Sequence, residues 1–349
     1  MKKNKILSTV AAVSLAMGTI LTGCGGSETT QDSANANNSG GDQPKAETIE
    51  LNLGHTLAPD SHYHAMATKL AELVEQKSNG TIKVTVFPQS QLGGEVKMIQ
   101  GARTGTVGML ITAQAPLTNT VPEYSLFDLP YLFDSIDQAN EVLDGPVGDK
   151  FLDMLPEHGM VGLGWLSVME RSVFSNKPIK SAADMKGFKV RVMQSPGYVK
   201  AYEALGAQPT PMAYSEVYLS LQQGVVDGAD TSPDQFVMDK FVEVSKYFNR
   251  TAVHYLPALV VVSKQKWDAM TPDQQKALQE ATDEALAYGK DYYKKSFDES
   301  LAKAKEAGVE IVDTDLESMK KATQPVYEEL LKEIPNGQAL FDEVQAAKK

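Results

Sequence analysis

The sequence is poor in residues and motifs on which several protein classes depend. It has one cysteine, Cys24, in 349 residues, so no disulfide can form within the chain. Aromatic residues make up only 7% of the composition, and four arginines stand beside 29 lysines. There is no Gly-x-Ser-x-Gly turn, no Gly-x-x-x-x-Gly-Lys-Ser/Thr phosphate loop and no His-Glu-x-x-His helix. These absences argue against the common hydrolase, nucleotide-binding and zinc-dependent enzyme classes.

Long apolar runs are also scarce, and the one clear example lies at the N-terminus. Residues 6–21 are uncharged and mostly apolar after a lysine-rich start, which is too short for a spanning helix and fits a secretory signal. The run ends in Leu21-Thr22-Gly23-Cys24, which resembles the lipobox of bacterial lipoproteins. We therefore predict a signal peptide over 1–23 and lipidation at Cys24. The alternative is an ordinary signal peptide with a chance cysteine.

The next segment lacks large apolar side chains altogether. Residues 24–48 contain no aromatic and no large aliphatic residue, so they cannot bury enough surface to offset the entropy of ordering. We interpret them as a flexible tether. The remaining residues, from 49 to 349, are more than one compact core usually holds, which predicts two lobes.

Positive charge is in deficit, since the net charge is −12. This balance argues against nucleic acid or an anionic lipid surface as a partner. If the ligand is an anion, the whole-molecule field repels it, and a few local cations must bind it.

Strand and helix patterns alternate along the first part of the folded region. Period-two alternation predicts strands at 49–53, 81–87 and 107–112, and apolar residues at helical spacing predict helices at 61–76 and 93–103. This order favours a mostly parallel sheet with helices on both faces.

The alternation continues in the second half of the chain, where strands are predicted at 160–166 and 171–175. A strand at 187–193 leads into a helix from Pro196, and an apolar strand at 256–263 is long enough to pass between lobes. The longest periodic segment, 271–307, predicts a helix that runs behind both lobes, with Gly289 as a point where it could bend.

The rarity of arginine directs attention to Arg191, because a guanidinium grips a carboxylate through two parallel hydrogen bonds as lysine cannot. Arg191 lies near the carboxyl end of its strand, and Phe188, Val190 and Val192 alternate onto the opposite face. Ligands of open α/β sheets bind beyond strand ends, and the helix starting at Ser195 adds free N–H donors. The alternative is a structural arginine paired with an internal carboxylate.

The sequence surroundings of the other three arginines give less support for ligand binding. Arg171 follows an apolar strand near a predicted crossing between lobes, where ligand clefts form. Arg103 ends a helix, where a cation is favourable for electrostatic reasons alone, and Arg250 suggests no particular role.

Three of the five histidines, His55, His62 and His64, lie close together in the sequence. A metal site is one interpretation. Surface or helix-capping histidines are the other, and the position of His62 and His64 at a predicted helix start favours it.

Several segments resemble the solute-binding proteins of tripartite ATP-independent periplasmic (TRAP) transporters, the DctP family. Residues 185–192 (MKGFKVRV) resemble the family's DLKGLKIRV segment, and residues 204–209 (ALGAQP) its ALGANP segment. Residues 214–228 (YSEVYLSLQQGVVDG) resemble SEVYTALQTGVVDG. Upstream, 87–93 (FPQSQLG) and 129–133 (LPYLF) resemble FP..QLG and LPFLF. Each motif is weak alone, and together they occur in the family's order.

The resemblance implies an α/β, two-lobed periplasmic binding protein fold of the type II-like kind. Each lobe would hold a mixed sheet with flanking helices, beside a hinged cleft. The expected boundaries are 49–168 plus about 257–298 for lobe I and about 169–256 plus 299–349 for lobe II. The resemblance further implies a small organic acid as ligand, a gradient-driven membrane permease as partner, and neither catalysis nor a cofactor.

The resemblance also assigns ligand-binding residues. Arg191 matches the arginine that forms a bidentate salt bridge with the ligand carboxylate, and Arg171 matches a second cleft arginine. Gln194 matches a polar contact and Tyr214 an aromatic wall.

Three further positions follow from the same comparison. Glu95 and Lys97 lie in the helix that faces the ligand from the other lobe. Thr231 stands where many members have an asparagine, so the contact to the ligand's far end differs from the family pattern.

Two alternatives share much of this pattern. One is the binding lipoprotein of an ATP-driven importer, which has the same two-lobed architecture. The other is a lipoprotein enzyme, which the missing catalytic motifs disfavour.

Overall fold

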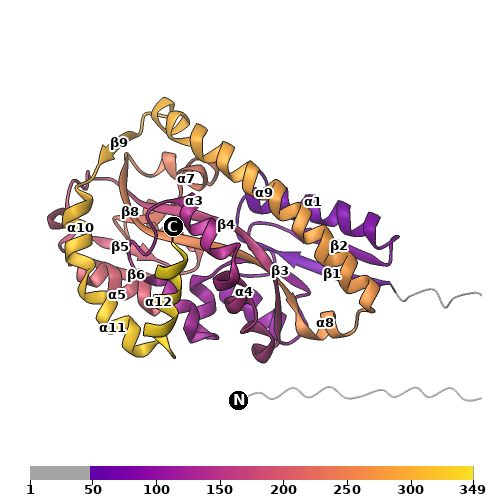
Figure 1. The fold of residues 1–349 in the computed structure, drawn as a ribbon. Helices are drawn as coiled ribbons and strands as arrows, with labels where there is room; N and C mark the ends of the chain where they lie inside the picture. The colour runs from indigo at the N-terminus through magenta and orange to yellow at the C-terminus, as the bar shows by residue number, and fades with distance from the viewer. Residues whose placement is uncertain (1–47, 349) are drawn as a thin grey trace, which may run out of the picture. The chain divides into compact units, whose positions relative to one another are not determined.

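The computed structural model describes residues 48–348, and a single nine-stranded mixed sheet organises them (Figure 1). The strands run in the order β2-β1-β3-β8-β4-β7-β5-β6, and β9 pairs with β8. Their bounds are β1 Ile49–Gly54, β2 Ile82–Phe87, β3 Met109–Ala113, β4 Met160–Ser175, β5 Lys189–Val192, β6 Gln208–Pro211, β7 Gly228–Thr231, β8 Tyr247–Ser263 and β9 Glu310–Asp313.

Helices cover the sheet and close its ends. The α-helices are α1 His62–Lys77, α2 Glu95–Arg103, α3 Ile136–Leu143, α4 Pro146–Leu152, α5 Pro196–Ala204, α6 Val217–Gln222, α7 Pro233–Met238, α8 Lys264–Asp268, α9 Pro272–Glu306, α10 Leu316–Thr323, α11 Pro325–Glu333 and α12 Gly337–Ala347. The 3₁₀ helices are η1 Ala115–Asn119, η2 Pro122–Asp128, η3 Leu155–His158, η4 Ala182–Met185, η5 Tyr214–Glu216 and η6 Phe241–Glu243.

The first three strands form the expected βαβαβ unit. β2 and β3 flank β1, and both pair with it in parallel. The helix α1 between β1 and β2 begins at the N-cap Ser61, whose hydroxyl accepts a hydrogen bond from the backbone of His64. The prediction of a parallel arrangement is therefore confirmed for this part of the sheet.

The centre of the sheet is antiparallel and depends on two unusually long strands. β4 and β8 pair along their whole length, so they join the β1–β3 part to the β5–β7 part. We expected two separate strands, 160–166 and 171–175, but β4 is continuous through Arg171. The charged residue does not end the strand because Asp230 neutralises it in the interior.

The helix α9 is the longest element, with 35 residues, and its predicted extent is confirmed. Figure 1 shows it running along the molecule from α8 to β9. It packs against α1, β4 and α7, so it contacts both halves of the sheet. Gly289 lies where a side chain would meet Met66 and Leu166 at less than 3 Å, so its role is close packing against neighbours within one continuous helix.

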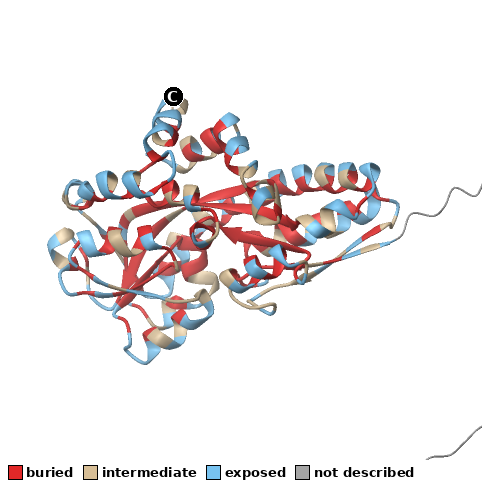
Figure 2. Ribbon diagram, turned by 90° about the horizontal axis from the view of Figure 1, so that it is seen from below, coloured by how far each residue is buried: buried red, intermediate tan, exposed pale blue. Residues whose placement is uncertain are grey.

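The interior is mainly apolar, and the charged side chains that it buries are Glu95, Asp128, Arg171, Arg191, Asp230 and Asp234. Buried residues follow the strands and the inner faces of the helices, whereas the outer turns of the helices are exposed (Figure 2). At the centre, buried charged residues interrupt this pattern, and Arg191 is among the largest fully buried side chains. The lobe boundaries given above stay a prediction.

No helix among residues 48–348 is long and apolar enough to cross a bilayer. The predicted signal peptide, the lipidation site at Cys24 and all but the last residue of the predicted tether lie outside the described residues.

Candidate functional site

A small cavity lies at the centre of the sheet, where its two halves meet. Its volume is about 20 Å³, room for about one water molecule. One wall comes from the segment 56–113, the other from 191–235, and β4 and β8 form the floor. The lining residues are Thr56, Leu57, Tyr63, Glu95, Ala113, Met169, Arg171, Arg191, Met193, Tyr214, Gln235 and Leu256.

Arg191 on β5 lines the cavity, and part of its guanidinium group has no hydrogen-bond partner among the described residues. The strand residues Val190 and Val192 point into the core and Arg191 points to the other face, as its alternation predicts. Nε and Nη2 donate to the carbonyl oxygen of Met212 at 3.2 and 2.9 Å. Nη1 is buried and has no hydrogen-bond partner among the described residues. The Nη1–Nη2 edge can therefore bind a carboxylate in the cavity.

The surroundings of Arg191 favour an anion. The guanidinium is 2% exposed and forms no ion pair with a carboxylate of residues 48–348. Burial and the neighbouring Arg171 lower the pKa of Arg191, which is the sign expected where a cation lacks a countercharge. The Tyr214 ring lies against it, with the Arg191 Cζ atom 5.8 Å from the ring centroid.

Arg171 lines the same cavity but already has a carboxylate partner. Nε donates to Asp230 Oδ2 at 2.8 Å and Nη2 to Oδ1 at 3.1 Å, and both side chains are at most 3% exposed. Burial alone would lower the pKa of Arg171, but the Asp230 carboxylate outweighs it and the pKa is raised. The predicted second cleft arginine is thus placed at the cavity with its charge compensated.

Glu95 supplies the only carboxylate among the residues that line the cavity. It is the first residue of α2, where the helix dipole favours an anion. Its Oε1 accepts hydrogen bonds from the Ala113 backbone at 2.8 Å and from Thr112 Oγ1 at 3.3 Å. Burial raises the pKa of Glu95, while Ala113 and Arg191 act in the opposite direction.

The helix α5 does not offer its N-terminus to a ligand, contrary to the expectation from sequence. The carboxylate of Asp128 already occupies that position: it accepts hydrogen bonds from Ser195 Oγ and from the Gly197 backbone. Gln114 Nε2 donates to the same carboxylate at 3.0 Å. An internal carboxyl group therefore satisfies these donors. Asp128 lies at the end of η2, and the sequence pattern did not predict that this segment lies beside α5.

Three predicted ligand contacts are not placed at the cavity. Lys97 is exposed and lines a separate surface hollow, because two residues along α2 turn its side chain about 200° away from Glu95. Gln194 is half-buried and does not line the cavity. Met193 lies at the wall instead, because β5 ends at Val192 and Met193 is the next residue. Thr231 lies behind the wall and donates to Gln235 Oε1 at 2.8 Å.

Sequence reasoning missed several lining residues. Gln235 is the main one: its Oε1 is held by Thr231, and its Nε2 contacts only the Met169 sulfur, at 2.9 Å. A thioether is a weak acceptor, so this N–H group is available to a ligand oxygen. The Ser232-Pro233 helix start after β7 was the available signal, because it places Gln235 at a strand end.

His55 and His62 are fully buried and His64 is half-buried, so the interpretation as surface or capping residues is wrong for His55 and His62. His62 and Asp234 approach to 3.4 Å with both side chains fully buried, and His55 pairs with His64 at 3.1 Å. Burial, followed by the charges of His64 and His62, lowers the pKa of His55 to about 3. Among residues 48–348, no three His, Cys, Asp or Glu side chains form a candidate metal site.

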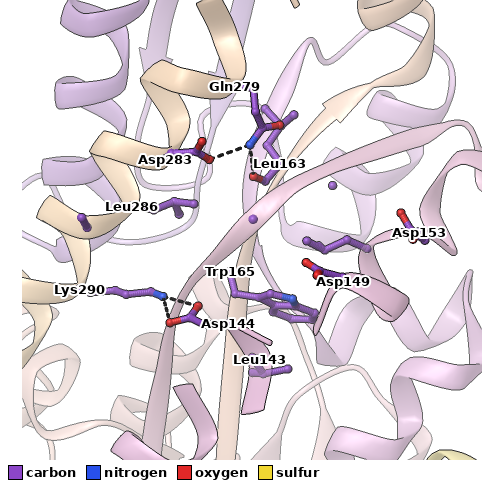
Figure 3. Close-up of a pocket in the computed structure, with 14 residues that line it drawn as sticks. Leu143, Asp144, Asp149, Asp153, Leu163, Trp165, Gln279, Asp283, Leu286 and Lys290 are labelled. Carbon is purple, nitrogen blue, oxygen red and sulfur yellow. Dashed lines mark hydrogen bonds and ion pairs between the residues drawn. The ribbon is translucent and has the colours of Figure 1, made fainter. Parts of the chain in front are cut away.

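A larger hollow of about 790 Å³ lies between β4 and α9 (Figure 3). Figure 3 shows Asp144, Asp149, Asp153 and Asp283 around it, and its one lysine, Lys290, binds Asp144. The excess of carboxylates makes this hollow unsuitable for an anion. The central cavity is the better candidate, because it combines buried lining residues with an uncompensated guanidinium.

A mixed α/β sheet crossed by two long strands, with a polar cavity between its halves, defines a two-lobed solute-binding protein. The model of bacterial extracellular solute-binding protein family 7, DctP, matches residues 53–333. The chain therefore belongs to this family of extracytoplasmic solute-binding proteins.

Curated relatives and a solved structure agree with the assignment. The 2,3-diketo-L-gulonate-binding periplasmic protein YiaO of Escherichia coli is 33% identical, over 84% of this chain and 92% of the relative. The C4-dicarboxylate-binding periplasmic protein DctP of Rhodobacter capsulatus is 32% identical, over 83% and 88%. A TRAP periplasmic solute-binding protein from Polaromonas sp. JS666, bound to D-erythronate, has a TM-score of 0.83 and 33% identity, over 86% and 99%.

Proposed function

We propose that this protein captures a small organic acid outside the cytoplasm and delivers it to a TRAP-type membrane permease. The observation that carries the proposal is the buried Nη1 of Arg191, which has no partner among the described residues and belongs to a side chain that lines the central cavity. The relatives support it, because those named above are described as binding 2,3-diketo-L-gulonate, C4-dicarboxylates or D-erythronate, and all of these carry a carboxylate.

We propose that Arg191 binds the ligand carboxylate through its Nη1–Nη2 edge and that Tyr214 forms the wall beside it. Gln235 donates to a ligand oxygen, and Thr231 positions Gln235. Arg171 also lies beside the ligand, but Asp230 neutralises its charge, so Arg171 does not supply a free cation for the ligand.

Binding requires the cavity to widen, because a four-carbon acid does not fit into about 20 Å³. The two walls come from separate halves of the sheet, so we propose that the predicted lobes separate around β4 and β8. The opening admits the acid, and reclosure buries it.

We also propose that the protein is attached to a membrane and has no enzymatic activity. Lipidation of Cys24 would anchor the protein, and residues 24–48 would keep the folded part near the permease. The protein binds without catalysis and without a cofactor. If the acid were instead converted on incubation with purified protein, the chain would be an enzyme.

Substitution of Arg191 tests the proposal. A thermal-shift panel of organic acids first identifies a binder, which at 100 times its Kd stabilises the fold by about 2.7 kcal/mol. Arg191→Ala then weakens binding by about 2–5 kcal/mol in calorimetry, because a buried carboxylate loses its partner. Arg191→Lys also weakens it, since a point charge cannot replace the planar fork.

The matched control is Arg250→Lys, which changes an exposed arginine paired with Asp313. It should leave affinity unchanged. A panel in which no organic acid raises the melting temperature, or an Arg191→Ala variant with wild-type affinity, would refute the proposed function.

A further inference from the structure

A hollow of about 400 Å³ lies between β4, α3 and α9, and it is named the edge hollow below. β7 pairs with β4 only over residues 172–175, so the preceding part of β4 has one edge without a strand partner among residues 48–348. On that edge the Val168 backbone donates to Asn140 Oδ1 of α3 at 3.1 Å. Glu170 lines the edge hollow and Arg171, the next residue, lines the central cavity, so β4 separates the two spaces.

The edge hollow carries an excess of negative charge. Lys290 and Lys294 are its two cations, and Lys290 binds Asp144, which does not line it. Five carboxylic acids also line it, and none of them forms an ion pair with a lysine or arginine of residues 48–348. These five are Asp134, Asp137, Glu170, Asp291 and Asp298. This balance favours a cation as occupant.

Ser167 gives independent support for a ligand in the edge hollow. This lining residue is 2% exposed, and its Oγ has no hydrogen-bond partner among the described residues. A buried hydroxyl without a partner is unfavourable, and a polar group of a ligand would satisfy it.

Glu170 is a second polar group of the same wall. It is half-buried, and its Oε2 accepts a hydrogen bond from the Tyr255 hydroxyl at 3.3 Å. Burial raises the pKa of Glu170, while the Tyr255 hydrogen bond and the charge of Arg250 act in the opposite direction. A cation beside this carboxyl group would favour its charged form.

The walls favour an organic cation over a metal ion. Tyr255, Tyr293 and Phe297 line the edge hollow, and the rings of Tyr293 and Phe297 have centroids 5.9 Å apart. Aromatic rings attract ammonium groups, whereas a metal ion needs several ligands close together. No three His, Cys, Asp or Glu side chains of the described chain form such a group. A primary amine fits better than a quaternary one, because only the primary amine has N–H groups to donate to oxygen.

The spacing of the two polar groups sets the length of the ligand. Ser167 and Glu170 are three residues apart on a stretch of β4 that pairs regularly with β8, so their Cα atoms are roughly 10 Å apart. A single ammonium group does not reach both side chains. A chain of four or five carbons with an ammonium at each end does.

We infer that the edge hollow is a second ligand site, which binds aliphatic diamines with a chain of four or five carbons. One ammonium group binds the Glu170 carboxylate and the other donates to Ser167 Oγ. The carbon chain lies against the aromatic rings, and the exposed aspartates at the rim attract the diamine from solution. This inference does not depend on acid binding in the central cavity.

Calorimetry on the purified protein at about 0.15 M salt, where long-range attraction to the acidic surface is screened, tests the site. The probes are 1,4-diaminobutane, 1,2-diaminoethane, butylamine, 1,4-butanediol and tetramethylammonium. The protein should bind one molecule of 1,4-diaminobutane, at least about 10-fold more tightly than butylamine or 1,2-diaminoethane. The diol lacks charge and tetramethylammonium lacks donors, so neither should bind measurably.

Two variants test the residues that hold the diamine. Ser167→Ala should weaken 1,4-diaminobutane about 5-fold while the urea midpoint stays the same or rises, because the folded protein loses an unsatisfied hydroxyl. Glu170→Gln keeps the side-chain shape, removes the charge and should weaken the diamine at least about 10-fold. Glu75→Gln makes the same change at an exposed position of α1 and should leave the affinity unchanged. Urea unfolding shows whether each variant is folded, and Ser167→Ala decides the inference even if Glu170→Gln is not.

The inference is overturned if 1,4-diaminobutane does not bind, or if Ser167→Ala and Glu170→Gln bind it as tightly as Glu75→Gln does. The second result would mean that only the overall negative charge attracts the diamine. Butylamine or 1,2-diaminoethane bound as tightly as 1,4-diaminobutane would exclude the two-ended arrangement.

Discussion

At the residue scale, the two buried arginines show how differently one residue type can be used. Arg171 is held by the side chain and backbone of Asp230. Arg191 is held by a carbonyl oxygen and keeps its Nη1 free of protein partners in the described chain. The first arrangement stabilises the fold, and the second leaves a charge for a ligand.

The Asp230 carboxylate should therefore be essential to stability. In Asp230→Asn two cations, Arg171 and Arg191, share the interior without a neighbouring aspartate, so we expect a loss of about 3–5 kcal/mol in the free energy of unfolding. Urea unfolding measures it. Asp313→Asn removes the exposed partner of Arg250 and should cost at most about 1 kcal/mol. Equal losses in the two variants would contradict this account.

Part of the candidate site could be predicted from the sequence, because some of its residues lie in recognisable motifs or at alternating strand positions. Arg191 and Tyr214 each lie within a family motif, and strand alternation turns Arg191 away from the core. Lys97 and Gln194 had the same kind of support, but helix rotation and the end of β5 direct them elsewhere. Gln235 was missed because its role depends on Thr231 and Met169, which only the fold brings near.

At the scale of elements, the start of α5 depends on a carboxyl group from a distant segment. Asp128, at the end of η2, is fully buried against Ser195 and Gly197. Burial raises the pKa of Asp128 to about 7, from an ordinary value of 3.8. The folded state then holds a proton that the unfolded state releases, so this group's contribution to stability is complete below about pH 4 and is lost as the pH rises through about 7.

The variant Asp128→Asn has no proton to release, so its stability should lack this pH dependence. Between pH 5 and pH 8 the variant should gain about 2 kcal/mol relative to the wild type, as measured by urea unfolding at both pH values. The control is Asp153→Asn, at an exposed position, which should follow the wild-type profile. Parallel profiles for the wild type and Asp128→Asn would show that Asp128 does not hold the proton.

Elements were predicted well where the pattern was local. The strands β1 to β3, the helices between them and the 35-residue α9 lie close to their expected bounds. The continuity of β4 was not predicted, because a charged pair at Glu170 and Arg171 is typical of a strand end unless a partner such as Asp230 neutralises it.

At the scale of the whole molecule, contacts near the cavity link segments that precede β4 with segments that follow it. His62 on α1 meets Asp234 on α7, Thr118 meets Ser195, and Asn119 Nδ2 donates to the Gln194 carbonyl at 2.8 Å. Closure buries Arg191 without a countercharge, which is unfavourable until an anion enters. The acid should therefore shift the population toward the closed form.

Small-angle scattering should record this shift as a smaller radius of gyration on adding saturating acid from the panel above. The Arg191→Ala variant, at the same acid concentration, should show no contraction, because the ligand no longer compensates a buried charge. A wild-type protein with an identical radius in both conditions would contradict closure around the ligand.

The sequence by itself determined the α/β alternation, the family and the arginine on the cavity face of β5, because period, motif order and strand alternation are local properties. Only the tertiary structure decided which charges are free. It pairs Arg171 with Asp230, gives the start of α5 to Asp128 and leaves Arg191 opposite Glu95. Compensation of a buried charge depends on which distant residue lies within a few ångströms, and no sequence spacing specifies that distance.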